Sequence, residues 1–148
     1  MTDELKLSLS KWIRAERDRV FAAWTEPELM RQWFCPRDLT LVAAEADVRV
    51  GGRFHAAMSN GTETYTVNGV YREVIAGQRL VFSHRWEEQH AVETLVTVEF
   101  ADRDGGTLVT LTHAGFRNQE SAKGHEGGWQ STLEHLELFL ARSAHGSS

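Results

Sequence analysis

The sequence of 148 residues contains a single cysteine, Cys35, and no apolar run near the roughly 18 residues that span a bilayer. One cysteine cannot form an internal disulfide, which is consistent with a reducing compartment. The first residues, MTDELKLSLSK, also lack a basic segment followed by an apolar one. We therefore expect a protein that does not associate with membranes and that is cytoplasmic.

The sequence also lacks an excess of positive charge. It has 16 Lys and Arg against 21 Asp and Glu, a net charge of −5, and no stripe of basic residues. Phosphate backbones and anionic lipids are thus poor partners, and nucleic acid is excluded first. A hydrophobic fraction of 41% with a mean hydropathy of −0.39 is typical of a globular protein. We expect one domain over residues 1–148, with 145–148 as a frayed tail.

Motifs for metals, cofactors and covalent catalysis are missing as well. There is no His-x-x-x-His or Cys-x-x-Cys spacing, and the double glycines at 51–52 and 105–106 lack the strand-to-helix context of a phosphate loop. Cys35 precedes Pro36 at a predicted helix end, where the helix dipole disfavours a thiolate. We expect no metal and no cofactor, and the sequence assigns no catalytic residue.

What is present is a strong helical pattern near the C-terminus, in the segment GHEGGWQSTLEHLELFLAR at residues 124–142. Trp129, Leu133, Leu136 and Leu140 follow the spacing of one helical face, and His125 precedes Trp129 by one turn. The opposite side is polar, so this helix should pack its apolar face on a large partner. The glycines at 127 and 128 should let the sheet or a ligand approach closely.

The rest of the chain reads mainly as strands. Alternation predicts a first strand over residues 5–13, and two short helices follow at 14–25 and from Pro27 to about Phe34. Six strands separated by short turns come next, at 39–50, 54–58, 64–74, 80–86, 93–100 and 107–113. The predicted order is therefore β-α-α-β6-α, an α+β antiparallel meander with the first strand at its edge.

A sheet of about seven strands curls under its own twist, and one long amphipathic helix can lie in its concave face. This arrangement is the helix-grip fold. Because one helix leaves part of that face uncovered, inward side chains must either fill the remaining space or line a cavity.

Several segments carry a resemblance to a known family: VFAAWTEPELMRQWF, DVRVGGRFHAAM, VNGVYREV, RLVFSHRW, TLVTVEF, GGTLVTLTHAGF and HEGGWQSTLEHLELFL. From about Ile13 to Leu140, the chain resembles the bacterial proteins that are homologous to the activator of heat-shock protein 90 ATPase. That family belongs to the START-like, or SRPBCC, superfamily, with the birch pollen allergen proteins, polyketide cyclases and lipid-transfer domains.

The resemblance implies three kinds of function. The first is binding of a small hydrophobic or aromatic molecule between the helix and the sheet, by a monomer or homodimer. The second is a cyclase or dehydratase that uses His84, His113 or a tyrosine as acid or base in the same cavity. The third is a chaperone-linked interaction module connected with the stress response, which would have a filled core. A cavity of roughly 300 Å³ or more favours the first two.

The candidate ligand-binding residues are those expected to face the helix or the cavity mouth. Pairing the predicted hairpins sets His84 opposite Leu95 or Val96, and those residues opposite Thr112 or His113, which brings His84 and His113 together. The alternative is that each histidine is an ordinary core residue. Trp33 and Phe34 are expected at the mouth, and the full set is Trp33, Phe34, Phe54, Met58, Tyr71, Phe82, His84, Trp86, Val96, Val98, His113, His125, Trp129 and Leu133.

If the first turns of the C-terminal helix touch the ligand, replacing their side chains should weaken binding. We expect His125→Ala and Trp129→Ala to reduce affinity for aromatic compounds more than Glu137→Ala on the polar side does. Quenching of tryptophan fluorescence by a panel of aromatic compounds measures this, and equal affinities for the three variants would contradict the assignment.

Overall fold

The computed structural model describes residues 5–146, which form one antiparallel sheet and three helices. The predicted α+β helix-grip order is confirmed. In chain order the elements are β1 (Lys6–Ile13), α1 (Arg17–Thr25), α2 (Pro27–Met30), β2 (Thr40–Ala46), β3 (Arg53–Ser59), β4 (Thr64–Ile75), β5 (Arg79–Trp86), β6 (Thr94–Arg103), β7 (Gly106–Ala114) and α3 (Gln119–Gly146).

The seven strands lie in the order β1-β7-β6-β5-β4-β3-β2. Strands β2 to β7 form a meander, and β1 pairs antiparallel with β7 at the edge, as expected. The β5–β6 pairing sets His84 opposite Thr94, one residue before the nearer of its two predicted partners, Leu95 and Val96. Val96 lies opposite His113, as expected. The paired residues of β5 and β6 are equally distant from Gln89, so the residue opposite His84 lies one position nearer the turn than predicted.

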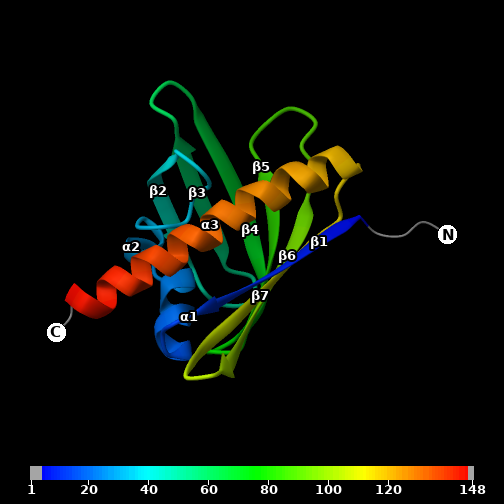
Figure 1. Cartoon of the computed structure of the whole chain (residues 1–148). Helices are drawn as coiled ribbons and strands as arrows, with labels where there is room; N and C mark the ends of the chain where they lie inside the picture. The colour runs from blue at the N-terminus through cyan, green and yellow to red at the C-terminus, as the bar shows by residue number, and fades with distance from the viewer. Residues whose placement is uncertain (1–4, 147–148) are drawn as a thin grey trace.

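Helix α3 crosses the concave face of the sheet diagonally, while α1 and α2 lie together at one end (Figure 1). Leu133, Leu136 and Leu140 are buried, which confirms the predicted apolar stripe. The helix begins five residues earlier than predicted, because the Asn118 side chain accepts a hydrogen bond from the Ser121 amide at 2.8 Å and caps it.

Helix α3 continues to Gly146, so it includes the first two residues of the segment expected as a tail, and residues 147–148 lie outside the described residues. None of the helices within residues 5–146 combines the length and apolar character needed to cross a bilayer. Helix α2 is also shorter than predicted: it ends at Met30, and hydrogen-bonded turns carry the chain to Phe34.

Aromatic rings fill one end of the space between α3 and the sheet. Trp24 of α1 contacts Trp33 and Phe34, with ring centroids 4.8 and 6.0 Å apart, and it stacks on Trp129 of α3 at 6.2 Å. Trp33 is only 1% exposed and donates its indole N–H to the Ala23 carbonyl at 3.0 Å. This end of the grip is therefore solid core.

The packing of α3 should dominate the stability of the fold. We expect Leu136→Ala, at a fully buried position, to lower the free energy of unfolding by about 2–5 kcal/mol through lost burial and a residual cavity. Leu138→Ala is the matched control, since Leu138 is 58% exposed and its loss should change stability by less than about 0.5 kcal/mol. Urea denaturation followed by circular dichroism measures both, and similar losses would contradict this packing.

Candidate functional site

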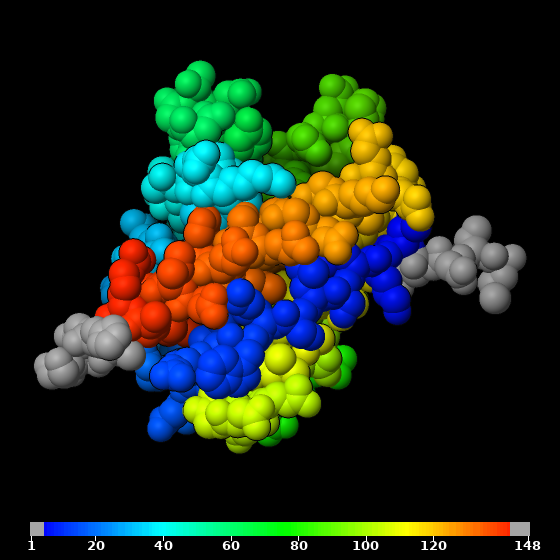
Figure 2. All heavy atoms as spheres, viewed as in Figure 1, coloured from blue at the N-terminus to red at the C-terminus, as the bar shows by residue number. Residues whose placement is uncertain are grey.

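A cavity of about 340 Å³ lies where the first turns of α3 pass over the sheet. Its walls come from α3, from the segment that follows α2, and from the inner face of β3 and β5. In the space-filling view, the β3–β4 hairpin and the β5–β6 loop stand apart on either side of a notch (Figure 2). The lining residues are Phe34, Cys35, Pro36, Arg37, Met58, His84, Trp86, Ser121, Gly124, His125, Gly128, Trp129 and Thr132.

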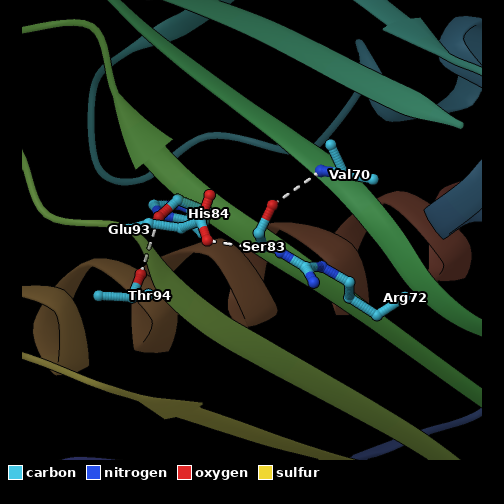
Figure 3. Close-up of polar contacts among 6 residues, drawn as sticks. All are labelled: Val70, Arg72, Ser83, His84, Glu93 and Thr94. Atoms are coloured by element: carbon cyan, nitrogen blue, oxygen red, sulfur yellow. Dashed lines mark hydrogen bonds and ion pairs between the residues drawn. The ribbon is translucent and has the colours of Figure 1, made fainter. Parts of the chain in front are cut away.

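The alternation of strand β5 aims His84 and Trp86 toward α3 and Ser83 away from it. On the outer side, the Ser83 hydroxyl accepts a hydrogen bond from the Val70 amide at 2.9 Å; next along β5, the His84 carbonyl accepts one from the Thr94 hydroxyl at 2.9 Å (Figure 3). These bonds fasten β5 to both neighbouring strands. The His84 ring is thus presented from a rigid element.

His113 is locked in place by hydrogen bonds at both ring nitrogens. The Trp129 indole donates to its Nδ1 at 2.9 Å, and its Nε2 lies 2.6 Å from the Thr94 hydroxyl oxygen. An indole N–H only donates, so Nδ1 is the acceptor and a neutral His113 carries its proton on Nε2. Since Thr94 gives its own proton to the His84 carbonyl, it accepts from His113. This chain of bonds positions Trp129 against the sheet.

His125 forms a second locked pair with Trp86. The Trp86 indole donates to Nε2 of His125 at 3.0 Å, and Nδ1 of His125 lies 2.8 Å from the Ser121 carbonyl, to which it donates. A smaller cavity of about 160 Å³ shares His84, Trp86, Ser121 and His125 with the larger one. The Trp86–His125 pair therefore forms part of the wall of both cavities.

His84 differs from these two histidines because its ring nitrogens hydrogen-bond to none of the described residues, although the side chain is only 4% exposed and lines both cavities. Burial, reinforced by His125, lowers the pKa of His84 to about 3. Burial, reinforced by His84 and His125, lowers the pKa of His113 to about 2. Both rings are neutral at pH 7, and His84 offers one donor and one acceptor to a ligand.

The structure divides the predicted site residues into two groups. Phe34, Met58, His84, Trp86, His125 and Trp129 line the larger cavity. Trp33 does not lie at its mouth, because its ring is packed against Trp24. The others expected to line it serve as core or support: Phe54, Tyr71, Phe82, Val96, Val98, His113 and Leu133.

Phe54, Tyr71 and Phe82 lie outside the cavity because they pack on one another. Their ring centroids are 5.0 to 6.0 Å apart, so they fill the sheet side of the grip beside the cavity. Burial raises the pKa of Tyr71 to about 12, with a smaller contribution from Asp47, and the phenol stays protonated. None of the three rings is available to a ligand in this arrangement.

Sequence reasoning missed the segment from Cys35 to Arg37 and the α3 residues Ser121, Gly124 and Thr132. Ser121 was missed because the predicted helix began after it. Asn118, a residue type that favours helix N-caps, would have indicated the earlier start. The predicted close approach at Gly127 and Gly128 is made by the Pro36–Arg37 segment rather than by the sheet. No local pattern marks that segment, because it reaches α3 only in the folded protein.

Cys35 is a buried thiol held by a hydrogen bond. Burial raises the pKa of the Cys35 thiol, and its sulfur donates to the Leu39 carbonyl at 3.0 Å, so it remains protonated. Within the described part of the chain, no three His, Cys, Asp or Glu side chains are placed to hold a metal ion. The site is a largely apolar cavity in which the His84 ring forms no hydrogen bond with the described residues.

A curved antiparallel sheet around a C-terminal helix, with a cavity beneath the first turns of that helix, defines a helix-grip protein of the START-like class. Residues 14–141 match the family described as "Activator of Hsp90 ATPase homolog 1-like protein", and the chain belongs to that family. No curated protein matches the sequence.

Solved structures of bacterial proteins share the fold over nearly the whole chain. The AHSA1 protein from Silicibacter pomeroyi is 25% identical, with a TM-score of 0.82 over 94% of this chain and 99% of its own. The AHSA1-like protein from Aeromonas hydrophila is 26% identical, with a TM-score of 0.79 over 95% and 94%. Protein NE0264 from Nitrosomonas europaea, 24% identical, has a TM-score of 0.83 over 95% and 97%.

The two buried histidines predict how stability depends on pH. Because their pKa values are lowered on folding, the unfolded chain binds more protons than the folded one below about pH 6.5. Their contribution to stability is complete above that pH and is lost as the pH falls toward 3. In NMR titrations, the ring signals of His84 and His113 should stay constant from pH 7 to about 4 in the folded protein.

The same two rings in urea-unfolded protein serve as the control and should titrate near the ordinary value of about 6.5. Titration of either ring between pH 6 and 7 in the folded protein would contradict their burial as neutral groups.

Proposed function

We propose that this protein binds a small, largely apolar molecule with an aromatic ring in the cavity beneath α3. The observation that carries the proposal is the cavity itself, with its volume of about 340 Å³ and its lining of Phe34, Met58, Trp86 and Trp129 around the unpartnered ring of His84. Ligand pockets of proteins have this character: mostly apolar walls with a few polar groups that orient the ligand. Aromatic walls favour a flat ring that can stack or meet them edge-on.

The volume of the cavity favours ligand binding over a purely structural interaction module. About 340 Å³ lies within the range of roughly 300–1,000 Å³ that small-molecule pockets occupy. The family's description names an activator of a chaperone ATPase, a role that would be carried by an outer surface and would need no cavity. An open apolar space lowers stability unless something fills it, so its presence supports a ligand-binding role.

The histidines favour binding over acid–base catalysis. A general base works best when its pKa is near the working pH. Burial lowers the pKa of His84 to about 3, which makes it a weak base at pH 7. His113 has both nitrogens engaged by Trp129 and Thr94. Neutral His84 is better suited to a fixed hydrogen bond with a hydroxyl, carbonyl or amide of the ligand.

A variant that fills the cavity tests this function. Gly124 lines the cavity, and a Cβ added there would meet no atom within 4 Å, so Gly124→Leu adds an apolar side chain at the cavity wall without a clash at its Cβ. We expect at least about tenfold weaker binding of aromatic compounds, because the leucine excludes them from the volume they need. Mass spectrometry of compounds that copurify with the wild-type protein, and tryptophan fluorescence quenching by a panel of aromatic compounds, provide the measurements.

Glu137→Ala is the control, since Glu137 pairs with Lys11 at 3.1 Å and does not line the cavity. It should bind like the wild type. Copurifying compounds that are equally abundant in wild type and Gly124→Leu would contradict binding in this cavity.

A further inference from the structure

Arg37 is the only Lys, Arg, Asp or Glu among the residues that line the larger cavity. The protein as a whole carries a net charge of −5, so a cation at the rim of an apolar cavity stands out from its surroundings. Binding of a neutral aromatic molecule, as proposed above, does not require this positive charge. Its placement is therefore informative about the ligand.

The segment that carries Arg37 is fastened to α3 by hydrogen bonds on either side of Pro36. Nδ1 of His135 donates to the Cys35 carbonyl at 2.7 Å, and the Arg37 amide donates to the Ser131 hydroxyl at 2.8 Å. Between them, Pro36 packs against α3 at Gly128. The backbone of Arg37 is thus anchored directly beside the helix that roofs the cavity.

Two further features describe how Arg37 lies beside the helix. Its backbone has a φ of 50°, in the left-handed region that a side chain like arginine rarely adopts without support from its surroundings. Its guanidinium lies against the bare backbone of Gly127, where an added Cβ would come within 2.8 Å of Nη2. The glycine therefore leaves the space in which the guanidinium sits.

The Arg37 guanidinium makes no hydrogen bond or ion pair within residues 5–146, although other arginines, including Arg72 and Arg79, are paired with carboxylates. A guanidinium presents its donors in a planar fork that matches the two oxygens of a carboxylate. Beside an apolar cavity, such a pair is screened less than one in open water.

We propose that the natural ligand is an aromatic carboxylic acid, whose carboxylate pairs with Arg37 at the rim while its ring enters the cavity. The inference rests on the proposed function and adds the charge of the ligand to it. One cation matches the single charge of a carboxylate, whereas a phosphate dianion would call for further cationic side chains, and no other Lys or Arg is among the described residues that line the cavity. The ring then lies among Met58, Trp86 and Trp129.

Comparing aromatic acids with their amides, which have nearly the same shape, isolates the effect of the ligand's negative charge on affinity. We would measure, by calorimetry at pH 7.5 and low salt, the binding of cinnamate and cinnamamide and of biphenylcarboxylate and biphenylcarboxamide. In the wild type the acids should bind at least about tenfold more tightly than the amides, and the advantage should shrink with added salt. Arg37→Gln should abolish the advantage, so that each acid binds no more tightly than its amide.

Gly127→Ala provides a second variant that keeps the charge. Its methyl group would displace the guanidinium, while alanine favours the helix, so the acid should lose affinity with no loss of thermal stability. Arg31→Gln is the control, because it removes an equal charge from an exposed residue that does not line the cavity, and it should keep the advantage.

The possible failures are distinguishable. Equal binding of acids and amides by the wild type would overturn the charge assignment and leave the cavity as a neutral binding site. Equal losses in Arg31→Gln and Arg37→Gln would overturn pairing at Arg37 in favour of long-range attraction. If no acid or amide bound, both this inference and the proposed function would be overturned.

Discussion

One helix must cover the concave face of a seven-stranded sheet, and this constraint shapes the rest of the molecule. Helix α3 buries Leu133, Leu136 and Leu140 along its apolar stripe, but it cannot fill the whole width of the grip. At one end, the space that α3 leaves unfilled is occupied by Trp24 and the aromatic rings around it. At the other end it is left as a cavity.

Trp129 lies on the boundary between these two regions. Its ring stacks on Trp24 on the filled side, and it also lines the cavity. Its indole N–H donates to His113, whose other nitrogen is held by Thr94. Because a buried indole N–H without a partner lowers stability, this hydrogen bond fixes how far Trp129 can turn toward the cavity. The limit of the binding space is therefore set by core packing.

The polar groups near the cavity are arranged so that little charge is buried. His113 and His125 have both ring nitrogens in hydrogen bonds with fixed roles, and His84 is kept neutral by burial. The one formal charge in the lining, Arg37, lies in an exposed position at the rim, where water offsets the cost of desolvation. This division suits a ligand with an apolar body and a polar end.

The cavity residues that could be predicted from the sequence belong to regular elements. Alternation along β5 and the period of α3 turn His84, Trp86, His125 and Trp129 inward, although the register was wrong by one residue. The same patterns also select Phe82, whose ring is taken up by core packing. Periodicity identifies the face of an element, but it does not say which part of that face is covered.

The sequence by itself determined the element order, the helix-grip fold and the apolar stripe of α3, because these depend on local periodicity and on short connections between neighbouring strands. Only the tertiary structure decided which end of the grip is filled and where the segment from Cys35 to Arg37 meets α3. That segment joins His135 and Ser131 across about a hundred residues of sequence. No local pattern can encode such a contact, because it exists only once the helix has docked on the sheet.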